Sequence, residues 1–217
     1  MAFSNARPDH LGQRLGEMVA LDNQPFSLVD NAGFKRLMAL VIPYYKLPCH
    51  TTLRRRVVPS LYRACRELVL GHLCKAEAQM VHYTSDIWSS EGGAHAYLSL
   101  TAHWWAAPGQ EATSTSGNEK EGYCWALLHV QVMDQSHTAV EIMKAINRMT
   151  ARWLASAPQL TRGFMVMEGG ANMVKVVREG GFEGIRCIAH ILNLLVKDGL
   201  GMGSKANWAF PPQHKGQ

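Results

Sequence analysis

The hydrophobic period of the chain changes near His82, and this change constrains the fold more than any other feature. Before it, apolar residues recur at helical spacing. After it come three segments rich in β-branched and aromatic residues, VHYTSDIWSS, HAYLSLTAHWW and GYCWALLHVQV. They are separated by the short SSEGG and by a polar loop, APGQEATSTSGNEKE. Three successive strands joined in this way predict an antiparallel meander.

The part that follows the meander alternates helix and strand. SHTAVEIMKAINRMTARWLAS is an amphipathic helix that Ser136 or Thr138 can cap. GFMVM then predicts a short buried strand, ANMVKVVRE a helix, GIRCIAH a strand and ILNLLVKDGL a helix. The order β-β-β-α-β-α-β-α predicts an α/β fold.

The N-terminal part is predicted to be helical. Asp30 or Asn31 can cap one helix, and Thr51 or Thr52 can cap a second. Pro59 must either kink the second helix or lie in its first turn, because proline has no N–H donor. The predicted organisation is a flexible segment over 1–17, a helical segment over 18–79, the α/β core over 80–200 and a disordered tail over 201–217.

Composition and charge limit the class of protein. The 217 residues are 47% hydrophobic and 18% charged, which is typical of a folded chain and not of a disordered one. The net charge of +5 suits an acidic partner such as nucleic acid, although many basic proteins have no such partner. The five cysteines form no disulfide framework, and no apolar run reaches the roughly 18 residues of a membrane span. We therefore expect a reducing compartment, the nucleus or the cytosol, and no membrane.

Two acidic residues stand at the ends of predicted strands. Three antiparallel strands, a crossover helix and a parallel strand are the order of a ribonuclease H-like core, in which the first and fourth strands are neighbours. Asp86 ends the first strand and Glu168 the fourth, before a glycine turn. Two neighbouring carboxylates can share divalent cations that stabilise a phosphodiester displacement. Asp86 and Glu168 are also ordinary residues for a turn.

Several motifs in a fixed order resemble a known family. They are TSDIWSS, AYLSLTAHWW, LLHVQVMDQSHTAVEI, ANMVKVVRE and IRCIAHILNLLVKDGL, after an N-terminal segment MVALDNQPFSLVDNAGFKRLMALVIPYYKLP. Over about residues 17–200, this chain resembles the hAT superfamily of DNA transposases, in the host-domesticated branch of the BED-type zinc-finger proteins.

The resemblance implies a ribonuclease H-like core that cuts and joins DNA with three acids and Mg²⁺ or Mn²⁺. Asp86 matches the first acid, and Glu168 stands at the second, in a motif that usually reads Asp-Asn-Ala-Ala-Asn-Met. This chain has Glu-Gly-Gly-Ala-Asn-Met, so the acid is one methylene longer and Gly169 replaces an asparagine. Misplacing a catalytic group by about 1 Å can cost about a hundredfold in rate. The family's third acid, BED finger and C-terminal dimerisation segment have no counterpart in this sequence, so the core is expected to be incomplete.

The resemblance therefore predicts a transposase-derived nuclear protein without catalytic activity. It would serve as a DNA-associated or protein-interaction module, with transcriptional regulation among its roles and with protein partners that the sequence does not identify. One alternative is a residual metal-dependent nuclease that uses Asp86 and Glu168. Another is a poorly folded product of a decayed gene copy.

Two groups of basic and metal-binding residues have a functional and a structural interpretation. Arg54, Arg55 and Arg56 form a basic helical face that suits a DNA backbone, or a solvated helix face. Cys187 and His190 have the spacing of half a zinc site, but such residues are more often part of a core.

Asn172 and the tryptophans also have two interpretations. Asn172 can orient a metal-bound water or cap the next helix. Trp88, Trp104, Trp105 and Trp125 lie on predicted strands, which favours core positions over base-stacking platforms.

Overall fold

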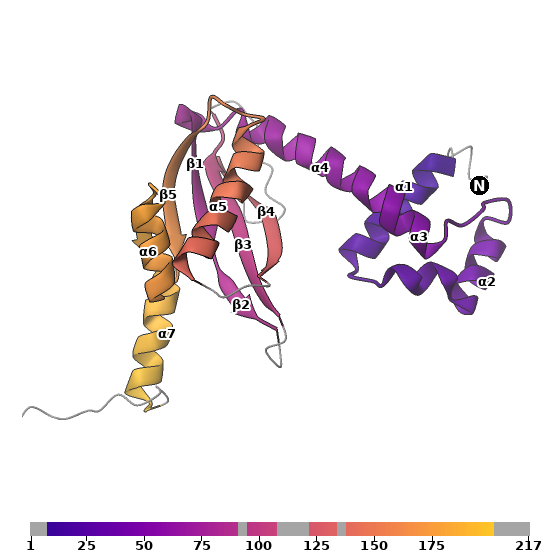
Figure 1. The fold of residues 1–217 in the computed structure, drawn as a ribbon. Coiled ribbons are helices and arrows are strands. Elements are labelled where there is room, and N and C mark those ends of the chain that lie inside the picture. Colours follow the sequence, from indigo (N-terminus) through magenta and orange to yellow (C-terminus); the bar gives the residue numbers. More distant parts are fainter. Residues whose placement is uncertain (1–7, 91–94, 108–121, 134–137, 202–217) are drawn as a thin grey trace, which may run out of the picture. The chain divides into compact units, whose positions relative to one another are not determined.

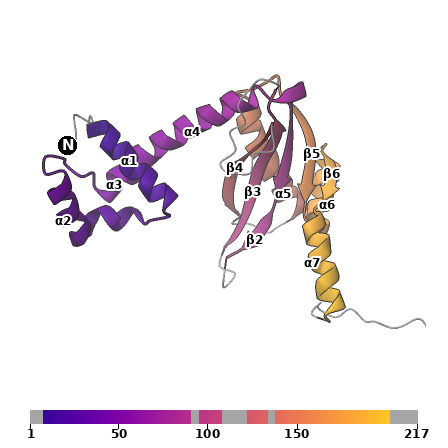
Figure 2. The ribbon, with the colours of Figure 1, turned by 180° about the vertical axis from the view of Figure 1, so that it is seen from behind.

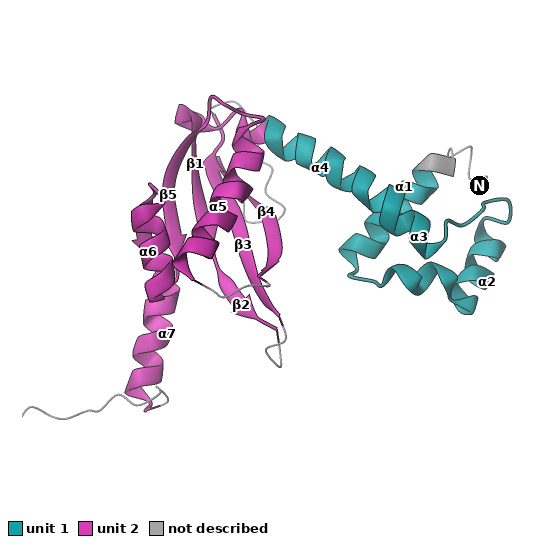
Figure 3. Cartoon of the chain, viewed as in Figure 1, with its two compact units in different colours: residues 1–71 teal, residues 72–217 magenta. Residues whose placement is uncertain are grey.

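The computed structural model describes residues 8–90, 95–107, 122–133 and 138–201. The chain divides into two compact units, Met1–Gly71 and His72–Gln217 (Figure 3). The division lies inside one helix, whereas the sequence predicts a boundary between residues 79 and 80. The predicted tail over 201–217 lies outside the described residues except for residue 201. Each unit is described by itself.

The first unit is helical (Figure 1). Its elements are α1 (Pro8–Leu21), the 3₁₀ helix η1 (Phe26–Asp30), α2 (Ala32–Val41), α3 (His50–Thr52), the π-helical turn η2 (Leu53–Val57) and α4 (Val58–Leu73), which continues into the second unit. Its core consists of Leu15, Val19, Val29 and Leu53, and Leu53 has no exposed surface. Four buried apolar side chains from three elements hold this small unit together.

Helix α1 differs from the expectation of a flexible N-terminus up to residue 17. Leu15 and Val19 are four residues apart, so they lie on one face of the helix and enter the core together. Gly16 lies between them, and a Cβ there would stand 2.6 Å from Val57 Cγ1. The helix therefore packs closely against η2.

Pro59 lies in the first turn of α4, directly after the π-helical turn. The N–H of Val58 donates to the carbonyl of Leu53, five residues back. A wider turn at this point is consistent with the missing N–H of the proline that follows. The predicted helix begins near Thr51, and α3, η2 and α4 follow one another without a gap from His50, so Pro59 lies inside this helical run and not in its first turn.

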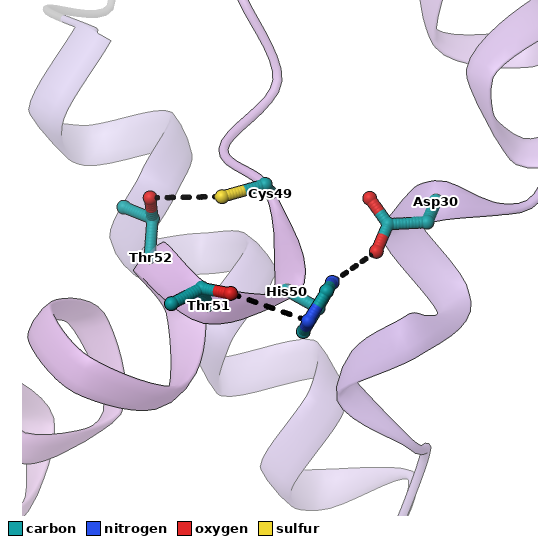
Figure 4. A network of polar contacts seen from close by, with 5 residues as sticks. All are labelled: Asp30, Cys49, His50, Thr51 and Thr52. Atoms are coloured by element: carbon teal, nitrogen blue, oxygen red, sulfur yellow. Dashed lines mark hydrogen bonds and ion pairs between the residues drawn. The ribbon is translucent and has the colours of Figure 1, made fainter.

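Neither of the expected helix caps in the first unit forms. Asn31 precedes α2 without a side-chain cap, and Cys49, not Thr51 or Thr52, precedes α3. Figure 4 shows what these polar groups do instead. The carboxylate of Asp30 accepts a hydrogen bond from His50 Nδ1, and Cys49 Sγ lies 3.3 Å from Thr52 Oγ1. The hydrogen bond of Asp30 ties η1 to α3.

The second unit is a mixed sheet with helices. Its elements are η3 (Glu77–Gln79), β1 (Met80–Ser85), β2 (Ile87–Ser89), β3 (Ala96–Trp105), β4 (Tyr123–Met133), α5 (Ala139–Leu154), β5 (Thr161–Met167), α6 (Ala171–Glu179), β6 (Glu183–Arg186) and α7 (Ile188–Gly199). The predicted order of strands and helices is confirmed, as is the α/β class. The first predicted strand is divided at Asp86 into β1 and β2, both of which pair with β3.

The strand order across the sheet is β4-β3-β1-β5-β6. The pairs β1–β3 and β3–β4 are antiparallel, which confirms the meander, while β1–β5 and β5–β6 are parallel. Helix α5 begins at the N-cap Thr138, whose hydroxyl accepts a hydrogen bond from Glu141 N at 3.4 Å. The other predicted cap, Ser136, lies outside the described residues.

Strand β3 shows how the sheet divides into two faces. Leu98, Leu100, Ala102 and Trp104 alternate on one face and are buried. Helix α5 packs on this face against β3, and α6 packs against β5 and β6 (Figures 1 and 2). The buried apolar side of α5 supplies Ile142, Ile146 and Met149.

The opposite face of the sheet exposes large side chains. Trp88, Trp105 and Trp125 are 41%, 48% and 41% exposed, so the core position expected for the tryptophans holds only for Trp104. Strand alternation places Trp125 and Trp104 on opposite faces, and α5 packs on the face of Trp104. Among the described residues, no helix is long and apolar enough to cross a membrane.

Candidate functional site

The parallel pairing of β1 with β5 places Asp86 and Glu168 at one edge of the sheet. Ser85 is paired with Met167, and the two acids are the next residues on each strand. The backbone of Asp86 is held in turn by β3, because its carbonyl accepts a hydrogen bond from Ser99 N at 3.0 Å. The structure thus brings together the two acids that the sequence singled out.

The two acids line a pocket of about 370 Å³. Its walls include the ends of β1 and β5, and the first turn of α7 contributes Cys187, His190 and Asn193. The start of α7 is held at this place because Cys187 N donates to Met167 O at 2.8 Å. The pocket therefore combines two carboxylates with an imidazole, an amide and a thiol.

Glu168 has the most perturbed charge in this pocket. Burial raises the pKa of its carboxyl, and the charge of Asp86 and a hydrogen bond between the two carboxyls raise it further. The charge of Asp86 therefore disfavours ionisation of its neighbour Glu168. His190 lowers the pKa of Glu168, and its Nδ1 lies 3.5 Å from Glu168 Oε1.

The family has the same Cys-His pair, and the resemblance implies that Cys187 and His190 take part in local packing and hydrogen bonding around the active-site floor; the structure adds the contact of His190 with Glu168. The strand predicted in GIRCIAH ends at Arg186, Cys187 precedes α7, and His190 lies in its first turn. Neither Cys187 nor His190 is a buried core residue, because His190 faces the acid pocket and Cys187 is half-buried beside it.

A divalent metal ion is implied by the family, and the donor set of the pocket does not fit it well. Mg²⁺ prefers oxygen ligands in octahedral geometry, whereas one of the two carboxylates here is paired with an imidazole. Over the residues that the structure describes, no group of three or more His, Cys, Asp or Glu side chains is arranged to hold a metal ion. The residues of this pocket alone do not make a two-metal site.

The turn after Glu168 differs in one detail from the prediction. Helix α6 begins at Ala171 with Gly170 as the N-cap, so Asn172 lies in the first turn and is not the cap. A Cβ at Gly169 would lie 3.7 Å from His190 Cδ2, which is an ordinary contact. A Cβ therefore fits at residue 169.

The three predicted DNA-binding arginines are exposed in η2, but they do not act as one group. Arg55 and Arg56 line a groove of about 640 Å³ in the first unit, together with Lys46 and Arg63. Arg54 is not among the lining residues. The run of three arginines could be seen in the sequence, whereas the contribution of Lys46 depends on the loop that brings it to the groove.

Known proteins match most of this chain, although no family model matches it. Human zinc finger BED domain-containing protein 4 is 33% identical over 188 residues, covering 86% of this chain and 15% of the relative. Mouse zinc finger BED domain-containing protein 6 is 29% identical over 194 residues, covering 89% and 20%. The putative AC transposase of maize is 21% identical over 207 residues, covering 88% and 23%.

The chain therefore spans about a fifth, or less, of the length of these BED-domain relatives. The relatives are of two kinds, BED zinc-finger proteins and transposases, and these are the two kinds that the ordered motifs resemble. The similarity runs across both units, since it covers nearly nine-tenths of the chain. The chain is thus a homologue of BED-type zinc-finger proteins and of a transposase, and it is similar to the domesticated branch of the hAT superfamily that its motifs resemble.

Proposed function

We propose that this chain is the ribonuclease H-like core of a transposase-derived nuclear protein, and that it associates with DNA without cutting it. The strand order β4-β3-β1-β5-β6, with acids at the adjacent ends of β1 and β5, supports this type of core. Transposases and BED zinc-finger proteins among the relatives support a nuclear, DNA-associated role. Regulation of transcription is the role that we propose for a DNA-associated protein without strand cleavage.

The proposal that the chain does not cut DNA rests on the contacts of the Glu168 carboxylate and on the changed motif around it. One oxygen of this carboxylate, Oε1, lies 3.5 Å from His190 Nδ1. A divalent cation bound at this oxygen would have to compete with that imidazole. The longer side chain and the replacement of asparagine by Gly169 point in the same direction.

A residual metal-dependent nuclease is the second candidate, and one observation favours it. Asp86 and Glu168 line the same 370 Å³ pocket, so a cation that entered would meet two carboxylates. The two candidates differ in whether wild-type protein binds Mg²⁺ or Mn²⁺ and nicks DNA.

The first experiment combines calorimetric titration of Mg²⁺ and Mn²⁺ with nicking of supercoiled plasmid. We expect neither binding heat nor nicking from the wild type. The double variant Glu168→Asp, Gly169→Asn restores the acid and the neighbour of the family motif, and the Cβ of the new residue 169 would make only an ordinary contact. It should gain measurable divalent-ion binding, which Asp86→Ala in the same background should remove. Nicking by the wild type that is lost in Asp86→Ala would establish the nuclease instead.

The second experiment tests DNA association and nuclear localisation directly. Fluorescence anisotropy of a labelled DNA duplex should show binding at low salt that weakens as salt rises, because counterions are released from the phosphates. Microscopy of the tagged full chain should show it in the nucleus. Absence of DNA binding at low salt would contradict the proposed DNA association.

A further inference from the structure

The basic groove of the first unit is the strongest cluster of like charge that the proposed acid pocket does not use. Lys46, Arg55, Arg56 and Arg63 line it, Thr52 and Ser60 add hydroxyl groups, and none of its lining residues is acidic. All four cationic residues are exposed. The groove is therefore a concave, positively charged surface with hydrogen-bond donors.

Most of these groups lie on one face of a continuous helical run. Thr52, Arg56, Ser60 and Arg63 are separated by three or four residues and Arg55 is next to Arg56, so their side chains follow one stripe along α3, η2 and α4. At about 1.5 Å of rise per residue, Arg55 and Arg63 stand about 12 Å apart along the helix axis. The cations thus form a row and not a single point.

Other parts of the same unit also line the groove. Gln13 of α1 and the segment that carries Tyr45 and Lys46 contribute side chains to it. A ligand in the groove would therefore meet Lys46 as well as the arginines.

The ion pairs of the first unit leave these cations available. Within residues 8–71, the salt bridges join Arg14 to Glu17 and His50 to Asp30, and neither uses a cation of the groove. Four neighbouring positive charges without a carboxylate create a local positive potential that attracts anions. Arginine is the side chain best suited to phosphate, because its planar guanidinium donates two parallel hydrogen bonds.

We propose that this groove binds the sugar-phosphate backbone of nucleic acid without regard to base sequence. The proposal rests on the DNA association proposed above and identifies the surface that carries it. A row of cations about 12 Å long matches several successive phosphates better than one isolated phosphate group. A concave groove also suits a rod-like polyanion better than the flat surface of an anionic membrane.

The test measures the affinity of the full chain for a labelled DNA duplex of mixed sequence over a salt series. Removing two phosphate contacts in Arg55→Ala, Arg56→Ala should lower the slope of log K against log salt by about 2 and weaken binding at least about tenfold at low salt. Arg54→Ala is the matched control, since it removes the same charge from the same run outside the groove. It should change the affinity by about twofold or less. Far-UV circular dichroism checks that each variant keeps its helices.

A second pair of variants tests the groove at two other cationic residues. Lys46→Ala, Arg63→Ala should lower the salt slope by about as much as the first pair, although these residues lie far apart in the sequence. Changing the base sequence of the duplex should leave the affinity within about twofold, because phosphate contacts carry no sequence information.

The outcomes separate this inference from the function on which it rests. If Arg54→Ala weakens binding as much as the double variant Arg55→Ala, Arg56→Ala does, the loss follows from net charge, and the proposal that DNA binds in the groove is wrong. If the wild type binds DNA and the groove variants bind equally well, DNA association stands and the surface lies elsewhere. If the wild type binds vesicles containing phosphatidylserine through Arg55 and Arg56 but binds no DNA, the partner is a membrane and both proposals fail.

Discussion

The two candidate sites of this protein gather like charges in different ways. In the second unit, strand pairing holds Asp86 and Glu168 at the ends of neighbouring strands, and the pKa of Glu168 rises as a result of burial and of its neighbour. In the first unit, Arg55 and Arg56 are exposed and lie on one helical run. The acid pair depends on long-range backbone pairing, whereas the basic row is largely local and gains Lys46 from packing.

This difference shows that charges from distant parts of a chain need a precise framework to come together, while charges on one helix face do not. The acid pocket should therefore be sensitive to changes in the sheet, and the groove to changes in the small helical core. The three predictions below test that contrast, beginning with the largest expected effect.

The largest effect is expected from cavities in the two cores. Leu53→Ala and Leu100→Ala each remove a fully buried side chain, one from each unit, and each should cost about 2–5 kcal/mol of unfolding free energy. All six tryptophans follow residue 71, so tryptophan fluorescence reports on the second unit, while far-UV circular dichroism also includes the helices of the first.

Leu53→Ala should shift the circular dichroism transition more than the fluorescence transition, and Leu100→Ala should shift both. Equal shifts of both signals in Leu53→Ala would show that the two units unfold together. A wild-type chain that melts without a cooperative transition would contradict the existence of both cores and would favour a poorly folded product.

A smaller effect is expected where α1 approaches η2. An alanine Cβ at Gly16 would lie 2.6 Å from Val57 Cγ1, so Gly16→Ala forces the two elements apart and should cost about 1–3 kcal/mol by circular dichroism. Gly33→Ala in α2 is the control, because a Cβ there meets nothing within 4 Å. It should be neutral or slightly stabilising. Similar losses of unfolding free energy in both variants would mean that α1 packs less closely against η2 at Gly16 than the structure shows.

The smallest effect is expected at Glu168 and depends on pH. Since its pKa is raised above the ordinary 4.5, folding favours the protonated acid, and the ionised carboxylate destabilises the native state once pH exceeds the folded pKa. Glu168→Gln should therefore be slightly more stable than the wild type near pH 7 and equal to it below the ordinary pKa. The side chain is 41% exposed, so solvent screens the effect and it should shrink as salt rises.

Denaturant unfolding at several pH values measures this difference. Glu183→Gln, at an exposed position of β6 outside the pocket, is the matched control and should show no such dependence. A Glu168→Gln protein that is less stable than the wild type at pH 7 would mean that the ion pair with His190 outweighs burial and the charge of Asp86.

Much of the second unit could be predicted from the sequence, because its signals are local. Alternation of apolar residues marks β3 and β4, and the 3.6-residue period marks α5. The position of Asp86 and Glu168 at strand ends is visible in the same way. Helix α1 was missed although Leu15 and Val19 have helical spacing, because Gly12 and Gly16 lie among them and resemble a loop.

Other features could not be predicted, because no local pattern contains them. Trp104 and Trp105 are neighbours in the sequence, yet one is buried and the other half exposed, since they lie on opposite faces of the sheet and α5 packs on the face of Trp104. Arg54 and Arg55 are likewise neighbours, and only Arg55 lines the groove.

The sequence by itself determined the succession of helices and strands, the family resemblance, and the two acids at the ends of their strands. These properties follow from the spacing of apolar residues, from composition and from the order of the motifs, which are properties of neighbouring residues. Only the tertiary structure decided that His190 pairs with Glu168, that Lys46 joins Arg55, and on which face of the sheet α5 packs. Each of these depends on packing between distant segments, where contacts follow from the shape of the whole unit and not from position along the chain.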